Sequence, residues 1–242
     1  GLISPRSVVR SHFPLPKEMK QKYKFLFKRV LYYFHGEKFF KRLNYDWKNL
    51  PSRTEIIQNI INKKNYEKYL EIGCDKDDNF SKIQAKIKIG VDPQRGGTKR
   101  MTSDEFFKNN NENFDIIFLD GLHTYEQTIK DIQNSLNTIS NGGIILIHDC
   151  LPKKIWNQIV PRVYGHWNGD VWKAIVHSRT FEKADTYTIM ADHGLGIIFK
   201  RKNRNLLNLK NTNFKNLKYA DYYNNHMKFM NLINYDNLEK IL

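Results

Sequence analysis

Between residues 66 and 200, short apolar runs alternate with stretches of helical spacing, which is the pattern of β-α-β units. Four runs predict parallel strands, at residues 69–72, 87–91, 114–119 and 144–147. The last two are almost continuously apolar, as expected for strands that are covered on both faces. Two later runs, 187–190 and 196–199, flank a glycine-containing loop and predict an antiparallel hairpin. The pattern therefore predicts an open, mostly parallel α/β sheet with a hairpin near its end.

Helices are predicted between and after these strands. A short one is expected around residues 80–85. Residues 125–139 carry one apolar stripe at spacings of three and four, formed by Ile129, Ile132, Leu136 and Ile139. The sequence Asn141-Gly142-Gly143 then predicts a turn. Further helices are expected at residues 171–177, with Asp170 as the N-cap, and at residues 219–233.

The length of 242 residues allows one domain with appendages, and 40% hydrophobic residues with 13% aromatics suffice for a core. Two cysteines are too few for a disulfide framework and favour a reducing, cytoplasmic setting. No apolar run approaches the roughly 18 residues of a membrane helix. The first ten residues also lack the order of a signal peptide. We therefore expect a soluble protein.

The net charge of +15 is concentrated at the two ends of the chain. Residues 1–50 hold 12 Lys and Arg against 3 acidic residues, residues 201–242 hold 8 against 3, and residues 51–200 hold 20 against 19. This distribution predicts a globular domain over residues 51–200 between two basic helical extensions. The first extension interleaves basic and aromatic residues. It predicts an amphipathic helix packed on the domain or, alternatively, contact with an anionic membrane surface, a phosphorylated glycan or nucleic acid.

Polar residues follow each of the four predicted parallel strands: Glu71 to Asp75, Asp92, Asp120 with His123, and His148-Asp149. Ligands of open α/β sheets bind outside the carboxyl ends of the strands, so we expect these residues to converge on one crevice. Gly73 would let the backbone approach a ligand before a helix N-terminus. Asp92 can accept the hydroxyls of a ribose. The alternative is that these carboxylates only cap helices.

Six motifs occur in one order along the chain: Tyr69-Leu70-Glu71-Ile72-Gly73, Gly90-Val91-Asp92-Pro93, residues 102–107, residues 114–123, Gly142-Gly143 to His148-Asp149-Cys150, and residues 169–173. This ordered set resembles the class I S-adenosylmethionine-dependent methyltransferases, in particular methyltransferase domain family 24. The resemblance implies a Rossmann-like methyltransferase sheet and S-adenosylmethionine as cofactor. It places Glu71 and Gly73 beside the methionine part of the cofactor, Asp92 at the ribose, Ser103 and Asp104 at the adenine, and Asp120 along the cofactor.

One segment departs from the family pattern. Family members usually carry a second glycine shortly after the first, where this chain has Asp75-Lys76-Asp77-Asp78-Asn79. Carboxylates next to the carboxylate of the cofactor would repel it unless they point outward. A non-catalytic binding module that keeps the fold is therefore an alternative to an enzyme.

Methyl transfer to an alcohol needs a base, and His123, three residues after Asp120, is the candidate. Its alternative role is to cap the following helix. Asp120, His148 and Asp149 can hold a divalent ion, as acids at these strand ends hold magnesium in the macrocin-type sugar O-methyltransferases that this arrangement resembles. Because magnesium prefers oxygen ligands, His148 either argues against a metal or favours manganese or another softer ion.

Two tryptophans and an aspartate near residue 170 are candidates for substrate contact. Trp167 and Trp172 can stack on a sugar ring while Asp170 accepts its hydroxyl groups, or the tryptophans belong to the core. We therefore predict an O-methyltransferase that acts on a hydroxyl of a sugar or glycan-like substrate. The alternatives are a methyltransferase of RNA or another polyanion, and the non-catalytic module.

Overall fold

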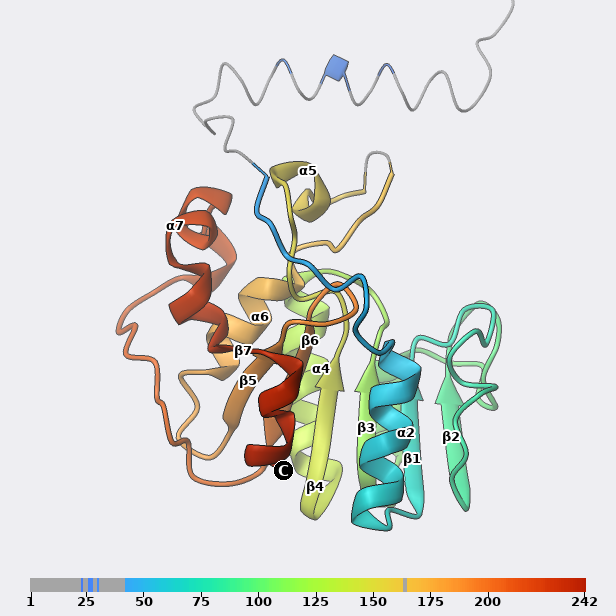
Figure 1. Cartoon of the computed structure of the whole chain (residues 1–242). Helices are drawn as coiled ribbons and strands as arrows, with labels where there is room; N and C mark the ends of the chain where they lie inside the picture. The colour runs from blue at the N-terminus through green and yellow to red at the C-terminus, as the bar shows by residue number, and fades with distance from the viewer. Residues whose placement is uncertain (1–22, 24–25, 28–29, 31–41, 163–164) are drawn as a thin grey trace, which may run out of the picture.

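The computed structural model describes residues 23, 26, 27, 30, 42–162 and 165–242. Its centre is a seven-stranded sheet of order β2-β1-β3-β4-β6-β5-β7 (Figure 1). The strands are β1 Lys68–Ile72, β2 Ile87–Val91, β3 Phe114–Leu119, β4 Ile139–Ile147, β5 Asp185–Ile189, β6 Leu195–Phe199 and β7 Leu232–Ile233. Strands β1 to β4 run parallel, and β6 lies antiparallel between β4 and β5. The predicted fold class is confirmed.

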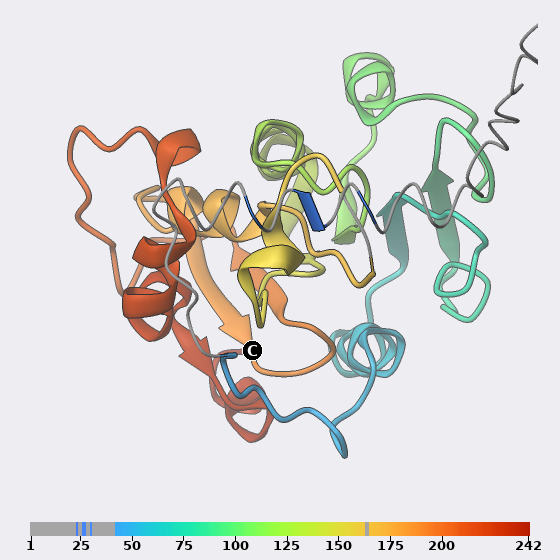
Figure 2. The same cartoon turned by 90° about the horizontal axis from the view of Figure 1, so that it is seen from above.

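Helices cover both faces of this sheet, which gives three layers (Figures 1 and 2). They are α2 Arg53–Lys64, α3 Ser103–Asn109, α4 Tyr125–Thr138, α5 Ile155–Gln158, α6 Val171–Ser178 and α7 Tyr219–Met230, with 3₁₀ helices at Phe214–Asn216 and Tyr235–Lys240. One core joins the sheet to α4, α6 and α7, and the other joins it to α2 and Leu238. Helix α4 buries Ile129 and Ile132 of the predicted stripe.

The order of the strands creates one switch point. The chain passes from β1 to β2 on one side and then crosses to β3 on the other side of β1. A crevice forms where the strand order reverses in this way, at the carboxyl ends of the strands. The fold therefore places a ligand site beyond the ends of β1 and β3, close to β2 and β4.

The helix predicted around residues 80–85 is absent, and this prediction is wrong. Residues 75–82 form turns, although Phe80 and Ile83 are buried as the pattern indicated. The Lys88 ammonium group donates to the carbonyl oxygens of Phe80 at 2.6 Å and Ile83 at 3.0 Å. Helical amides would otherwise satisfy these oxygens, so a side chain from β2 replaces the helix.

The turn predicted at residues 141–143 is also different, because these residues belong to β4. Gly142 nevertheless has a positive φ of 79°, and the register between β3 and β4 shifts between Phe114 and Ile116. The chain thus bends within the strand instead of leaving the sheet. This irregularity lies at the far end of β4 from the crevice.

The C-terminal residues pack into the domain. Tyr219, Tyr222 and Met230 of α7 are buried, and β7 adds a parallel strand beside β5. Most of the basic extension predicted for residues 1–50 lies outside the described residues. Within the described part of the chain, no helix is both long and apolar enough to cross a membrane.

Candidate active site

Two adjoining cavities open at the carboxyl ends of the strands. The wide cavity has a volume of about 440 Å³, and Val91, Asp92, Ser103 and Asp104 are among the residues that line it. The polar cavity, of about 300 Å³, is lined by Arg53, Glu71, Asn79, His123, His148 and Asp149 among others. Gly73, Asp75 and Asp120 line both. The expected convergence of the strand-end residues is thus present, divided between two connected spaces.

Gly73 lines both of these cavities. Its φ is +89°, a conformation that favours glycine. A Cβ atom at this position would collide with the carbonyl oxygen of Asp120. The close approach of the ends of β1 and β3 therefore requires glycine and leaves backbone exposed where a ligand would lie.

Asp92, at the end of β2, is held by backbone amides. Its Oδ1 accepts from Gln94 N at 2.8 Å and Arg95 N at 3.0 Å, and its Oδ2 accepts from Asp75 N at 3.0 Å. Burial alone would raise the pKa of Asp92, but these bonds lower it below its ordinary value. A carboxylate has about four acceptor positions, so roughly one is left for a ribose hydroxyl instead of the expected two.

At the other end of the wide cavity, one amide group organises three polar side chains. The Nε2 of Gln127 lies 3.1 Å from Ser103 Oγ, 2.9 Å from Asp104 Oδ1 and 3.1 Å from Asp131 Oδ1. The hydrogen bond from Gln127 is the largest cause of the lowered pKa of Asp104. Burial raises the pKa of Asp131 to about 6. The first turn of α3, predicted to lie beside an adenine, therefore borders the wide cavity.

The acidic segment 75–79 is tied to neighbouring loops. The Asp75 carboxylate pairs with Arg95, and the Asp77 carboxylate accepts from Gly97 N at 2.7 Å. Asn79 faces inward, where its amide donates to Glu71 Oε2 at 2.8 Å and its oxygen accepts from Thr54 Oγ1 at 2.7 Å. Two of the carboxylates thus have partners in the loop after β2, which reduces the repulsion expected from this segment.

Glu71 is buried at the polar cavity. Its Oε2 also accepts a hydrogen bond from the Tyr69 hydroxyl. Burial is the largest cause that raises the pKa of Glu71 to about 7, against the lowering effect of these hydrogen bonds. A carboxyl group with this pKa exchanges its proton near neutral pH.

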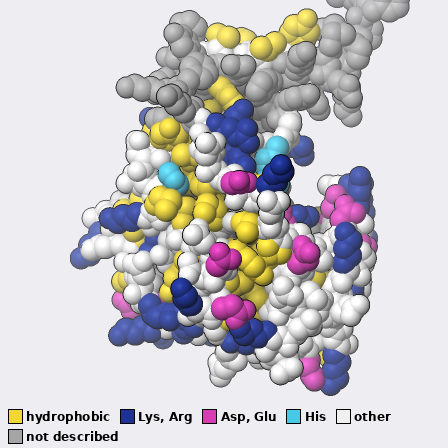
Figure 3. Space-filling view, in the orientation of Figure 1, with side chains coloured by type: hydrophobic (Ala, Val, Ile, Leu, Met, Phe, Trp, Pro, Cys, Tyr) yellow, Lys and Arg dark blue, Asp and Glu magenta, His cyan; other side chains and the backbone are white. Residues whose placement is uncertain are grey.

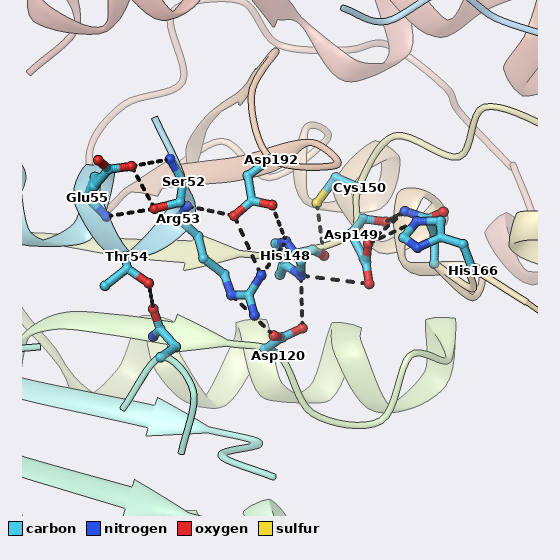
Figure 4. A network of polar contacts seen from close by, with 12 residues as sticks. Ser52, Arg53, Thr54, Glu55, Asp120, His148, Asp149, Cys150, His166 and Asp192 are labelled. Carbon is cyan, nitrogen blue, oxygen red and sulfur yellow. Dashed lines mark hydrogen bonds and ion pairs between the residues drawn. The ribbon is translucent and has the colours of Figure 1, made fainter. Parts of the chain in front are cut away.

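Asp120, at the end of β3, is the centre of a network of charges (Figure 4). Its Oδ1 lies 3.2 Å from both His123 Nε2 and His148 Nδ1. Arg53 Nε lies 3.8 Å from its Oδ2. Burial would raise the pKa of Asp120, but the charge of His148 and the bonds to both histidines hold it well below its ordinary range. Asp120 is therefore a permanent anion.

His148, at the end of β4, lies between two carboxylates. Its second nitrogen, Nε2, lies 3.5 Å from Asp192 Oδ1. Burial would lower the pKa of His148, but the charge of Asp120 and bonds to both carboxylates raise it to about 10. Both nitrogens of His148 therefore face carboxylates, and the metal ligation predicted for this residue would compete with these contacts.

His123 occupies the same network from the loop after β3. Its ring stacks on Trp167 with centroids 5.4 Å apart. Its Nδ1 is buried without a hydrogen-bond partner and lies 3.4 Å from Asp149 Oδ2. Burial would lower the pKa of His123, but the bond to Asp120 and the charges of Asp120 and Asp149 raise it above 6.5.

The resemblance to macrocin-type enzymes implies a divalent ion, and one group of residues fits it. Asp120, His123 and Asp149 each offer a ligand atom, and these atoms lie within 4.8 Å of one another. The buried, unpartnered Nδ1 of His123 is consistent with such a ligand. Two carboxylates and an imidazole suit manganese better than magnesium.

The predicted substrate residues divide into three cases. Trp172 is completely buried and donates to Gln158 Oε1 at 3.2 Å, so its predicted stacking on a sugar is wrong and the core alternative holds. Asp170 is the N-cap residue of α6, but its side chain makes no capping hydrogen bond to the amides of that helix; it accepts from Tyr125 N at 2.7 Å and pairs with the Lys173 side chain. These partners occupy the carboxylate that a substrate would need. Trp167 remains at the site through its contact with His123.

Two charged residues of the site were missed by sequence analysis. Arg53 begins α2, and its guanidinium group lies near Asp120, His148 and Asp192 (Figure 4). Asp192 lies in the hairpin loop, where its carboxylate also accepts from Arg53 N at 2.6 Å. Neither follows a predicted parallel strand. The signal that was present, Ser52 with Glu55, indicated only a helix N-terminus.

Comparisons with known proteins agree with this geometry. Residues 58–150 match the family model described as "Methyltransferase domain". This segment carries β1 to β4 and their polar ends, and the strand order places its crevice at the switch point. The fold and the crevice are therefore those expected of a class I S-adenosylmethionine-dependent methyltransferase domain, to which this part of the chain is similar. A search of curated proteins finds no match to the chain.

Several solved structures are similar to this chain at low identity. One is the SAH-bound methyltransferase PaMTH1 of Podospora anserina, with 14% identity, 80% of this chain and 100% of that chain covered, and a TM-score of 0.49. Another is an O-methyltransferase of Bacillus cereus in complex with SAH, with 11% identity, 78% and 94% covered, and a TM-score of 0.47. The likeness to methyltransferase domains rests on the family match over residues 58–150, and the strand order agrees with it.

Proposed function

We propose that this domain transfers the methyl group of S-adenosylmethionine to a hydroxyl group of a sugar or glycan-like acceptor, with His123 as general base. The observation that carries this proposal is the unpartnered Nδ1 of His123, a residue that lines the polar cavity, which shares Gly73, Asp75 and Asp120 with the wide cavity. The wide cavity has the volume of a small-molecule site. The cofactor, when bound there, supplies an electrophilic methyl group.

The residues of the polar cavity support proton removal. When Nε2 of His123 carries its hydrogen and donates to Asp120, the lone pair of Nδ1 is free to accept the hydroxyl proton of the acceptor. The imidazolium that forms then lies between Asp120 and Asp149, whose charges stabilise it. Arg53 and His148 keep Asp120 ionised and in place.

The polar lining supports a sugar as acceptor. Carboxylates and an amide of the polar cavity can accept and donate hydrogen bonds to several hydroxyl groups, and the half-buried Trp167 offers an aromatic face beside His123.

The test combines cofactor binding with product formation. We expect S-adenosylmethionine to bind in calorimetry and S-adenosylhomocysteine to form when a panel of monosaccharides and their phosphates is added. Amines and single-stranded RNA serve as comparison acceptors. Failure to bind the cofactor would reject the proposal that the domain is a methyltransferase. Methyl transfer to RNA alone would reject the proposal that a sugar hydroxyl is the acceptor.

A second possibility for the reacting end is metal assistance through Asp120, His123 and Asp149, favoured by their mutual distances. A bound divalent ion would polarise the acceptor hydroxyl and lower its pKa. If His123 is a ligand, it is not the base. In that case we expect chelation to abolish turnover and manganese to restore it more fully than magnesium, whereas a base alone works in excess chelator.

A further inference from the structure

A third cavity, with a volume of about 260 Å³, lies next to the site and has a different character. It is lined mainly by Arg42, Lys153, Lys154, Asn157, His166 and His193, and we call it the basic pocket. In the upper part of the face shown in Figure 3, Lys and Arg side chains gather beside histidines. No acidic residue is among the described residues that line it.

The basic pocket is built from four segments that are bonded to one another. Leu43 N donates to Lys153 O at 3.0 Å, and Leu151 N donates to His193 O at 3.0 Å. The Asn157 amide donates to His166 O at 2.9 Å. The Lys153 ammonium group lies 3.7 Å from the centre of the Trp47 ring. The cations are therefore carried by a connected framework.

Within the described ranges, no carboxylate lies within ion-pair distance of Arg42, Lys153 or Lys154. One carboxylate, Asp46, acts on Lys153 through its charge, but from beyond ion-pair distance. Burial, and then the charge of Arg42, lower the pKa of Lys153. Burial, and then His166, lower the pKa of His193. Repulsion between like charges at a concave site is relieved when an anion binds.

A metal ion is the competing occupant, because Asp149, His166 and His193 offer ligand atoms within 4.8 Å of one another. The Lys and Arg side chains of the pocket oppose it, since their positive charges repel a divalent cation and attract an anion. Asp149 Oδ1 is also occupied by a hydrogen bond of 2.8 Å from the Asn168 amide. The charge of the pocket thus favours an anion.

We infer that the basic pocket binds a phosphate group of the methyl acceptor. His166 Nε2 lies 3.9 Å from Asp149 Oδ1, and Asp149 Oδ2 lies 3.4 Å from His123 Nδ1. One carboxylate therefore separates the pocket from the proposed base. A phosphorylated sugar would span this distance, with its phosphate in the pocket and a hydroxyl at His123. The placement of the hydroxyl rests on the proposed function, whereas the phosphate site does not.

The test uses inorganic phosphate as the probe in calorimetry of the full chain. We expect binding by the unaltered protein, a loss of about tenfold or more in affinity in the double variant Lys153→Gln/Lys154→Gln, and no change in Lys183→Gln. Lys183 lines a separate cavity with Lys200 and Lys202 and is a matched control. Thermal melting shows whether each variant is folded, and His193→Asn replaces the double variant if the latter is not.

Two outcomes would overturn the inference: no phosphate binding by the unaltered protein, or equal loss of affinity in Lys183→Gln. Manganese binding that depends on His166 and His193 and excludes phosphate would assign the pocket to a metal instead. Calorimetry with S-adenosylmethionine on the same samples separates the two proposals. Cofactor binding without phosphate binding would reject only the proposed phosphate site. Phosphate binding without cofactor binding would reject only the proposed methyltransferase function.

Discussion

His123 has a buried nitrogen without a hydrogen-bond partner and a pKa that two flanking carboxylates raise. Because only the neutral imidazole accepts a proton, turnover should rise with pH through an apparent pKa above 6.5. His123→Ala should lower turnover by about 10²–10⁴-fold while cofactor affinity is nearly unchanged. The measurements are steady-state rates across pH and calorimetry with S-adenosylmethionine.

His226→Ala is the control for this variant, since His226 is a half-buried histidine of α7 that lines neither cavity of the site and contacts Tyr223 O at 3.0 Å. It should retain the normal rate. A normal rate per folded molecule in His123→Ala would end the general-base proposal and leave His123 as a structural residue that stacks on Trp167.

Most of the acceptor positions of the Asp92 carboxylate are used within the protein, because three backbone amides donate to its oxygens. Asp92→Asn replaces one acceptor with a donor that faces these amides. We expect a fall of roughly 1–3 kcal/mol in the free energy of unfolding and at least about tenfold weaker binding of S-adenosylmethionine. Urea denaturation and calorimetry measure the two effects, with the exposed Asp236→Asn as control. Unchanged cofactor affinity would show that Asp92 does not contact the ribose.

At the scale of helices and strands, the sequence predicted an element correctly where the spacing of its apolar residues matched the residues that are buried. The four parallel strands and α4 formed where they were predicted, although β4 begins earlier, at Ile139, because each carries enough apolar residues to identify it. The carboxyl ends of parallel strands share one edge, so Asp120, His123, His148 and Asp149 could be grouped before the fold was known. The structure of residues 80–85 could not be predicted in this way. Lys88 donates to carbonyl oxygens of this segment, and sequence spacing does not reveal that contact.

Arg53 and Asp192 show the same limit at the site. They come from a helix start and a hairpin loop that are far apart in the sequence and are brought together by the fold. Their role is to surround Asp120 and His148 with compensating charge, which is a property of the folded arrangement.

Asp170 joins two helices, and its removal tests that role. Its carboxylate accepts from the first amide of α4 and pairs with Lys173 of α6 at 3.2 Å. Asp170→Ala should lower the free energy of unfolding by about 1–2 kcal/mol, because the α4 amide loses its acceptor. Urea denaturation measures this, again against Asp236→Asn. A substrate-binding Asp170 would instead leave stability unchanged and raise the KM for the acceptor.

At the scale of the whole molecule, the C-terminal segment joins the end of the sheet opposite the crevice. Arg201 donates to Asp185 Oδ2 at 2.8 Å and to Ile241 O at 3.1 Å, so one side chain ties β5 to the last residues of the chain. Asp185 also accepts from Arg204 Nε at 2.7 Å. The carboxylate is completely buried between these partners.

This buried carboxylate gives the last prediction, which concerns stability against pH. Burial would raise the pKa of Asp185, but the bonds from Arg201 and Arg204 lower it below its ordinary value. A carboxylate with a lowered folded-state pKa stabilises the fold above its unfolded pKa of about 3.9, and this contribution is lost as pH falls through the folded value. Asp185→Asn should therefore be less stable than the unaltered protein by roughly 1–3 kcal/mol at pH 7.

The difference between the two proteins should then shrink below about pH 4, since protonation makes the unaltered Asp185 resemble the amide. Urea denaturation of both proteins across this range measures the difference, so that the titration of Asp92, Asp120 and Asp192 cancels. The free energy of unfolding of Asp236→Asn should equal that of the unaltered protein both at pH 7 and below about pH 4. A difference for Asp185→Asn that persists at full size to pH 3 would mean that packing of the side chain, and not its charge, joins the C-terminal segment to the sheet.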